Sequence, residues 1–420
     1  MLSVRKVLLL WVCCLGWTVP LSAALQEIPG GTGFSPESVM FDFSGLVAGA
    51  PAQDLLAKWG IRFEPSADAV PEVDQIVQLG FVNSFVVNRP PQGGDATKPI
   101  VITFRYPARK VAFFLRDTNS QVNVKAFDNL GTNLGEVNLA ATHQGSATFG
   151  VGTDDPKGIS KLLITYVPGA EAPQLLVESV DDLKVEFIQR PQFTIYFAQV
   201  GDGPIPGVGK LQSAFVVTNL SGSTAEGEIR FFNSQGNPLQ VSDGTTTASS
   251  FSLNLPPRGS FSFTTAGNAQ PLAVGYAKVT ANVPVDGTAI FRIVNNSGGL
   301  ISEAGVGAAE GHLVSVGAVQ KLSAGNIDSG IAVVNAGTVR STAFVQLVEP
   351  SGQTRDTNFG AVQLEPGAHN AQFLSQMFPS LQNQDFTGTV RIVSDQPLAL
   401  VILRTAAGLV QSSLPVGSLE

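Results

Sequence analysis

Along most of this chain, apolar and polar residues alternate with the two-residue period of a β-strand that buries one face. Residues 122–127 show the pattern clearly, with Val122, Val124 and Ala126 on one face. Turn sequences such as Asp128-Asn-Leu-Gly131 separate these segments. Only residues 51–59 and 371–378 favour a helix, and both segments are short. In the first half of the chain, strands are predicted over residues 99–104, 110–115, 122–127, 159–166 and 182–187.

A long internal repeat organises the second half of the chain. The first copy contains SAFVVTNLSGSTAEGEIRFFNSQGNPL and the second contains SGIAVVNAGTVRSTAFVQLVEPSGQTR. Asn219 corresponds to Asn335 and Gly236 to Gly352, at a constant separation of 116 positions (335 − 219 and 352 − 236). The match continues to the ends of the copies, where residues 289–292 correspond to residues 401–404.

A period of this length exceeds a solenoid unit of about 20–50 residues and suits a complete sandwich of about 100 residues. Pro191 interrupts the strand pattern just before the first copy, and the copies meet in the Gly/Ala-rich residues 304–312. We therefore predict an all-β fold of three consecutive β-sandwich domains, the last two immunoglobulin-like. Their predicted ranges are residues 25–188, 192–305 and 308–420.

The first 24 residues have the form of a secretory signal peptide. Arg5 and Lys6 precede an apolar run over residues 7–16, and Ser22-Ala-Ala24 supplies small residues for cleavage. Cleavage is expected after Ala24, with cleavage after Ala23 as the alternative. The protein is therefore expected to be secreted and extracellular, with the periplasm or cell surface as alternatives.

Two other interpretations of the amino terminus remain open. Pro20 disfavours an uncleaved anchor helix, and Val12 disfavours a lipoprotein signal at Cys13. Cleavage would remove Cys13 and Cys14, the two cysteines of the chain, and leave no disulfide. Secreted proteins without disulfides are more typical of bacteria than of animals.

Composition narrows the range of partners. Of the 420 residues, 44% are hydrophobic and 14% are charged, against about 25% charged in an average soluble domain. The net charge of −8 becomes −10 when the two positive charges of the leader are removed. Nucleic acid and anionic membranes are therefore not expected partners. After the leader, no segment reaches the roughly 18 uninterrupted apolar residues of a membrane helix; residues 397–410 come closest but contain Arg404.

Several motifs resemble those of known β-domain families. The first domain contains Phe41-Asp-Phe43, Trp59-Gly-Ile-Arg-Phe63, residues 111–117, residues 126–131 and Val180-Asp-Asp-Leu183. With these motifs, residues 25–188 look like the jelly-roll domains of secreted bacterial surface proteins. The repeats contain Tyr196-Phe-Ala-Gln199, Gly287-Thr-Ala-Ile-Phe-Arg292, Leu364-Glu-Pro-Gly367 and Leu414-Pro-Val416. With these motifs, they resemble a tandem β-domain of uncharacterised secreted proteins from soil bacteria. These motifs specify fold more than activity.

Few residues favour catalysis. After the leader the histidines are His143, His312 and His369, one in each predicted domain, and each is expected to be solvated or hydrogen-bonded rather than catalytic. Residues 201–210 are similar to a phosphate loop, but Leu211 stands where Ser or Thr is required and a strand follows instead of a helix. We expect a plain loop there and no enzyme activity.

Acidic residues at the two ends of the first domain form the one candidate metal site. The first and last strands of a jelly roll are neighbours, so Glu37 and Asp42 are expected to approach Asp181 and Asp182. Calcium takes six to eight oxygen ligands, and carboxylates supply them readily. The sequence therefore predicts a possible structural calcium ion. The alternatives are solvated charges and, much less favoured, a glycosidase pair.

Sugar binding is a second possibility for the first domain, because carbohydrate surfaces use flat Trp and Tyr rings. Trp59 is the only tryptophan after the leader and is the candidate ligand residue. The favoured function is a secreted, non-enzymatic protein that binds an extracellular protein or glycan in adhesion or at a cell surface. Loops or exposed sheet edges would make the contacts. A calcium-assisted, lectin-like protein is the alternative, and an extracellular hydrolase is third.

Overall fold

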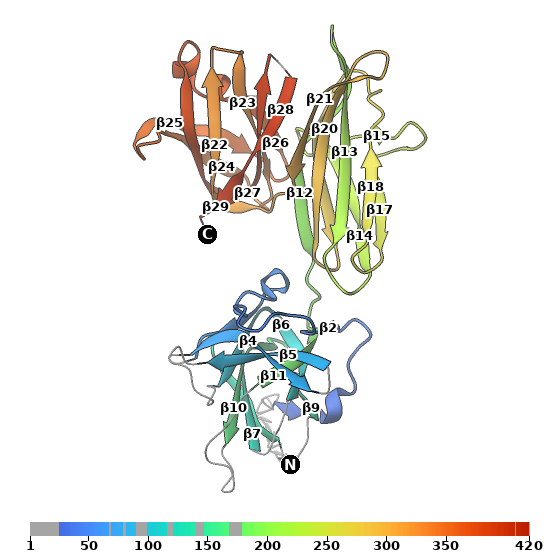
Figure 1. Cartoon of the computed structure of the whole chain (residues 1–420), viewed down its shortest axis with the longest axis vertical. Helices are drawn as coiled ribbons and strands as arrows, with labels where there is room; N and C mark the ends of the chain where they lie inside the picture. The colour runs from blue at the N-terminus through green and yellow to red at the C-terminus, as the bar shows by residue number, and fades with distance from the viewer. Residues whose placement is uncertain are drawn as a thin grey trace, which may run out of the picture. The chain divides into compact units, whose positions relative to one another are not determined.

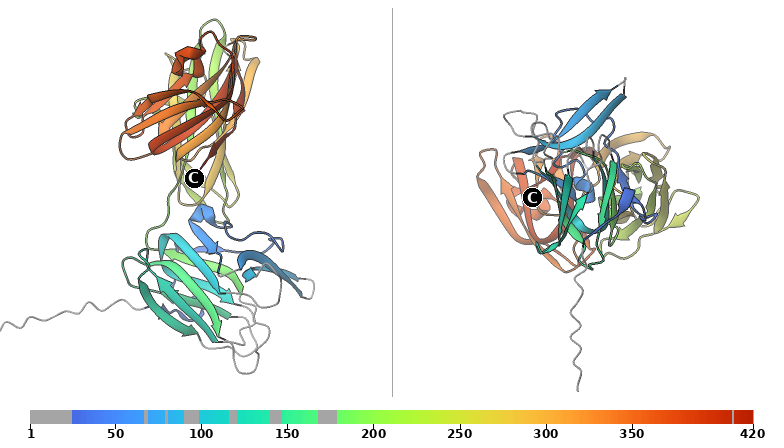
Figure 2. Two further views of the ribbon diagram at one scale, coloured as in Figure 1. Left: turned by 90° about the vertical axis from the view of Figure 1, so that its left-hand side faces the viewer. Right: turned by 90° about the horizontal axis from the view of Figure 1, so that it is seen from below.

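The computed structural model describes residues 25–66, 69–78, 81–89, 99–115, 121–139, 147–167, 179–407 and 409–419. The predicted leader and His143 lie outside these ranges. The chain divides between Arg190 and Pro191 into two compact units, called here unit one and unit two. Strands dominate both units (Figures 1 and 2), which confirms the all-β class. Among the described residues, no helix is long and apolar enough to cross a membrane.

Unit one is organised around β6 (Ile100–Leu115), which takes part in two layers of strands. The first part of β6 pairs with β3 (Ile61–Glu64) and β10 (Ile159–Val167). Its second part pairs with β9 (Ala147–Gly152) and β11 (Ser179–Phe187). The remaining strands are β1 (Gln26–Glu27), β2 (Val39–Phe41), β4 (Val70–Gln78), β5 (Phe81–Arg89), β7 (Gln121–Phe127) and β8 (Asn133–Leu139).

Two sequence expectations for unit one are corrected. The segments 99–104 and 110–115 belong to one strand, because a register shift opposite Ala108 accommodates Pro107, which has no N–H for the ladder. The segment 51–59 forms turns and the short 3-10 helix η2 (Ala57–Trp59) rather than an α-helix. Its hydrogen bonds join residues three apart, as from the Trp59 N–H to the Leu56 carbonyl at 2.9 Å.

Unit two contains both copies of the repeat, and each copy builds the same two layers. In the first copy the layers are β17-β14-β19-β12 and β18-β13-β20-β21; in the second they are β25-β24-β27-β22 and β26-β23-β27-β28. The first-copy strands are β12 (Phe193–Ile205), β13 (Gly209–Asn219), β14 (Ala225–Asn233), β17 (Ser250–Leu255), β18 (Ser260–Thr264), β19 (Ala273–Ala281), β20 (Val285–Val294) and β21 (Leu300–Gly307), with the small β15 (Val241–Ser242) and β16 (Thr247–Ala248).

The second copy uses one long strand where the first uses two. Its strand β27 (Phe386–Ala406) pairs with β24 and β22 over its first half and with β23 and β28 over its second half, so it takes the places of both β19 and β20. The other second-copy strands are β22 (His312–Leu322), β23 (Ile327–Asn335), β24 (Ser341–Val348), β25 (Thr354–Leu364), β26 (His369–Phe373), β28 (Leu409–Leu414) and β29 (Val416–Ser418).

The two cores differ in composition. The first copy is filled by a cluster of phenylalanines, in which Phe231 contacts Phe215, Phe251 and Phe263 at ring-centroid distances of 5.4, 6.1 and 5.6 Å. The second copy is mainly aliphatic, and it buries α1 (Leu374–Met377) and η3 (Pro379–Leu381) against its sheets. The helical turn predicted within residues 371–378 is therefore confirmed, although it is short.

Buried polar side chains at equivalent positions make equivalent hydrogen bonds, so the two copies share structure as well as sequence. The Asn219 side-chain amide donates to the carbonyls of Ser223 at 2.7 Å and Pro256 at 3.0 Å. Asn335 donates in the same way to Val339 at 2.9 Å and Leu364 at 3.0 Å. Both asparagines are buried. Because a buried polar group is costly unless it is hydrogen-bonded, these amides hold the same chain crossing together in each copy.

A buried serine also occupies equivalent positions in the two copies, again 116 positions apart (329 − 213). Ser213 Oγ bonds both the N–H and the carbonyl of Gly201, at 3.0 and 2.8 Å. Ser329 Oγ bonds the N–H and the carbonyl of Gln320, at 2.8 and 3.0 Å. In each copy the hydroxyl joins the first two strands where they leave regular pairing.

Candidate binding cleft in unit two

The four predicted calcium ligands lie in unit one, and the structure does not bring all of them together. β2 and β11 are antiparallel neighbours, with Phe41 opposite Leu183, as expected for opening and closing strands. This register places the backbone of Asp42 beside that of Asp182. Glu37 lies in the turn before β2, at the other end of that strand. Three strand residues separate the two ends by roughly 10 Å, too far for both carboxylates to bind one calcium ion.

Two of the other carboxylates, those of Asp42 and Asp181, accept backbone N–H groups. The hydroxyl and N–H of Ser44 donate to Asp42 and lower its pKa. Asp181 is buried, and its Oδ1 accepts the N–H of Asp182 at 3.0 Å. Within the described ranges, no three His, Cys, Asp or Glu side chains form a group that could hold a metal ion.

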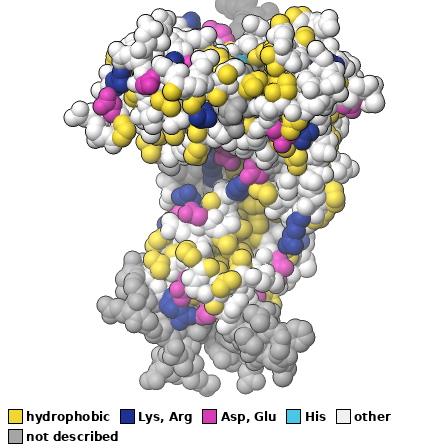
Figure 3. Space-filling model, turned by 45° about the horizontal axis from the view of Figure 1, so that its top comes forward, with side chains coloured by type: hydrophobic (Ala, Val, Ile, Leu, Met, Phe, Trp, Pro, Cys, Tyr) yellow, Lys and Arg dark blue, Asp and Glu magenta, His cyan; other side chains and the backbone are white. Residues whose placement is uncertain are grey.

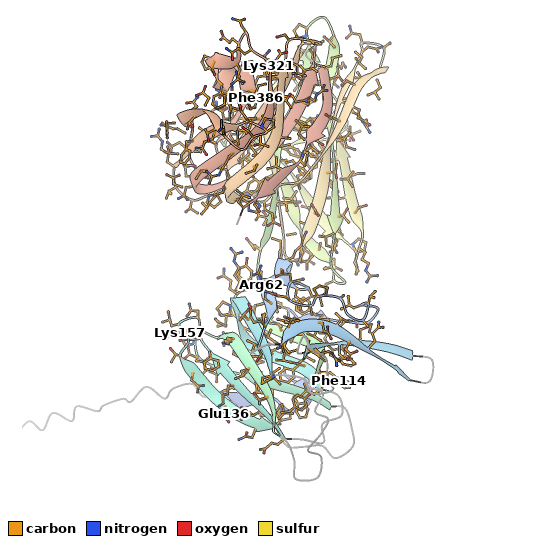
Figure 4. The ribbon with its side chains drawn as sticks, turned by 60° about the vertical axis from the view of Figure 1, so that its left-hand side comes forward. Arg62, Phe114, Glu136, Lys157, Lys321 and Phe386 are labelled. Carbon is orange, nitrogen blue, oxygen red and sulfur yellow. The ribbon has the colours of Figure 1, made fainter. Side chains whose placement is uncertain are left out.

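The clearest electrostatic site of unit one is also structural. Asp128 accepts the N–H groups of Leu130 and Thr132 at 2.9 and 2.7 Å and the ammonium of Lys157 at 3.0 Å. Burial raises the pKa of Asp128, but Lys157 and the two N–H groups outweigh it and hold that pKa at about 2. These bonds close the turn predicted at residues 128–131. Figure 4 labels Lys157 on unit one.

Trp59 is a core residue rather than a ligand platform. Only 7% of it is exposed. Its ring stacks on Phe187, with a centroid distance of 6.4 Å and an interplanar angle of 2°, and meets the edge of Phe41 at 5.3 Å. A sugar-binding ring must offer a free face, so the prediction of Trp59 as a ligand residue is wrong.

The histidines differ in environment. His312 starts β22 and is partly exposed. His369, expected in a turn and either solvated or hydrogen-bonded, is 4% exposed and lies where the first copy contacts the second. Its N–H donates to the Ser234 carbonyl at 3.0 Å, and its Nδ1 lies 3.3 Å from the Ser234 hydroxyl. Burial lowers the pKa of His369 to about 4, and the nearby Ala198 backbone offsets this only in part.

Further contacts fasten the two copies around His369. The Tyr276 hydroxyl donates to the Gly367 carbonyl at 2.7 Å, and the Tyr276 ring lies 6.1 Å from that of His369. Burial, helped by the neighbouring Tyr196, raises the pKa of Tyr276, so its hydroxyl stays protonated and donates. At Gly236, where φ is +81°, a Cβ would lie 2.8 Å from the Gly367 oxygen. The copies therefore meet too closely here for any larger residue.

These contacts leave a cleft of about 390 Å³ between the copies. Its lining comes from β12, β13 and β20 of the first copy and from β23, β26, α1 and β27 of the second. The residues are Gln199, Ile205, Leu211, Phe291, Ile293, Gly330, Ile331, Ala332, Ala371, Gln372, Phe373, Gln376, Leu403 and Thr405. Most of the lining is apolar, and its polar members are three glutamines and a threonine. Figure 3 shows hydrophobic side chains at the surface on one face of the molecule.

One polar atom of the cleft is unsatisfied. Gln199 Oε1 is buried and has no hydrogen-bond partner among the described residues. Gln376 Oε1, in contrast, accepts the Phe373 N–H at 2.8 Å. The cleft therefore combines an apolar surface, an uncharged rim and one buried acceptor, which suits binding of a mainly apolar ligand that can donate a hydrogen bond.

A second cavity of about 410 Å³ lies between β21 with its following segment and the end of the chain. It is lined by residues 306–310 and 413–418 with His312, Ser315, Leu400 and Val401. Its lining mixes apolar side chains with Glu310, His312 and three serines, so this cavity is more polar than the first cleft. The cleft was not foreseen from the sequence because it arises from the packing of two copies, although Gln199 belongs to a motif noted for the repeat.

Comparison with known proteins adds little. No protein-family model matches the chain, and no curated protein sequence matches it. A chain from the atomic structure of the Sulfolobus Turreted Icosahedral Virus is 11% identical, with 92% of this chain and 99% of that chain covered and a TM-score of 0.18. A chain described under the triple jelly roll fold and turret assembly of an archaeal virus is 11% identical, covering 85% and 91%, with a TM-score of 0.17. Likeness at these TM-scores supports no conclusion about this chain.

Proposed function

We propose that this chain is a secreted, non-enzymatic binding protein whose two-copy unit captures an extracellular partner in the cleft between the copies. The cleft carries the proposal. Its volume of about 390 Å³ lies within the roughly 300–1,000 Å³ of typical ligand sites. Its apolar, amide and hydroxyl side chains hold a ligand without transferring protons near neutral pH. The amino-terminal signal pattern supports delivery outside the cell.

Binding in the cleft is testable with the neutral apolar dye Nile red. The dye should fluoresce with the full chain, and Leu403→Glu should abolish this signal because a charge in the cleft opposes apolar burial. Phe359→Glu is the matched control, since Phe359 is 80% exposed on β25 and does not line the cleft. Equal dye binding by wild type and Leu403→Glu would contradict the proposal.

Secretion has its own test. The chain recovered from the culture medium of expressing cells should begin at Leu25, which follows the predicted cleavage site. Full-length protein retained inside the cells would contradict that part of the proposal.

A further inference from the structure

β26 presents an unpaired backbone edge at the cleft. Among the described strands it pairs only with β23, and it forms the end of that layer. In an antiparallel ladder, alternate residues direct their N–H and carbonyl groups away from the partner strand. The N–H of His369 points away and reaches Ser234, and that of Phe373 points away and reaches Gln376. Ala371, midway between them and exposed, must therefore direct its N–H and carbonyl outward as well.

The first copy already uses this edge. The Ser234 carbonyl accepts the His369 N–H at 3.0 Å, so backbone from outside the second copy contacts β26 at its first residue. From Ala371 to Phe373 the same strand lines the apolar cleft. An added strand would continue this edge, and every second side chain of that strand would point the same way.

We propose that β26 and the cleft together bind an extended, uncharged peptide segment of a partner protein. This inference rests on the proposed function and names the ligand class. The peptide pairs its backbone with Ala371 and places an apolar side chain among Phe291, Leu403 and their neighbours. A peptide or side-chain N–H of the segment donates to Gln199 Oε1, the unsatisfied acceptor. The lining offers no charged side chain to pair with an ion, so a charged residue at the inserted position is excluded.

A displayed library of random twelve-residue peptides, selected against the full chain, tests the inference. The enriched sequences should be uncharged and should carry apolar residues at every second position. Affinity of the strongest peptide should fall about tenfold or more on Leu403→Glu and on Ala371→Pro, which removes the N–H at the edge. Val339→Glu, at an exposed position outside the cleft, is the control and should leave affinity unchanged.

A matched pair of peptides covers the case in which Ala371→Pro fails to fold. N-methylation of the peptide nitrogen that faces β26 should weaken binding to the wild-type chain by a similar factor, and N-methylation of the next nitrogen should not. The inference would be overturned if no peptides are enriched, or if the affinity of the enriched peptides changes neither with Ala371→Pro nor with N-methylation. If Nile red binding still depends on Leu403 in that case, the cleft is a site for small apolar molecules and the proposed function stands. If the selected peptides match segments of this chain, the ligand is a second copy of the chain, and the inference of a partner protein is overturned.

Discussion

Acid should loosen unit two through His369. The pKa of this imidazole is lowered from 6.5 to about 4 by burial in the folded chain. A histidine with a depressed folded pKa favours its neutral form in the folded chain, so its contribution to stability is complete above pH 6.5. That contribution is lost as the pH falls from 6.5 towards 4 and is absent below about 4. The difference of about 2.5 pKa units corresponds to about 3 kcal/mol of unfolding free energy.

The surroundings of His369 explain why protonation is costly. Tyr276 and Ser234 face it from the first copy, and both are neutral. His369 Nε2 is buried, and the Ala198 backbone nearby only partly offsets the effect of burial on the pKa. A proton on this ring therefore meets no acidic partner, and the contact between the copies must open to hydrate it.

Urea unfolding at pH 7.5, 5.5 and 4.5, followed by far-UV circular dichroism, measures the effect. Wild type should lose stability in unit two across this range, whereas His369→Gln should start less stable and show little of this pH dependence. Fluorescence of Trp59, the only tryptophan after residue 24, follows unit one as an internal reference. His312→Gln is the control and should behave as wild type. Equal pH dependence in wild type and His369→Gln would refute the reasoning.

Three further predictions concern the buried framework and the acidic residues. Asn219→Ala and Asn335→Ala should each cost about 2–3 kcal/mol in urea unfolding, because each leaves buried carbonyls without a donor; a loss in only one copy would contradict their structural equivalence. Trp59→Ala should cost about 3–5 kcal/mol in unit one, as judged by calorimetry, whereas a ring used only for ligands would leave stability unchanged. Because Glu37 lies apart from the other predicted ligands, the melting temperature should be the same in millimolar calcium and in chelator. A higher melting temperature in calcium would contradict this and support the predicted metal site.

The sequence predicted what depends on local pattern and on comparison of the copies. The spacing of Asn219 and Asn335 identified positions that make the same buried hydrogen bonds. The alternating segment 122–127 became β7. The sequence did not predict that β6 is continuous, because a proline such as Pro107 usually ends a strand. Only the pairing with β10 shows that a register shift accommodates Pro107.

The residues at the contact between the two copies could not be predicted from the sequence. His369 follows a turn glycine and has the local pattern of an exposed residue, and its burial depends on Ser234 and Tyr276, which are far away in the chain. Trp59 was the candidate ligand residue because carbohydrate surfaces use flat Trp and Tyr rings. Its stacking on Phe187 depends on tertiary packing. The cleft itself belongs to neither copy alone.

The central claim is that the two copies form one body with a fixed cleft, and a spin-label distance measurement tests it most directly. Cys13 and Cys14 are the only cysteines of the chain, so with both replaced, labels can be placed at Ser297→Cys in the first copy and Ser351→Cys in the second. Pulsed electron–electron double resonance at pH 7.5 should give a single narrow distance distribution that broadens in His369→Gln at the same pH. A broad distribution in the otherwise unmodified chain at pH 7.5 would contradict the account.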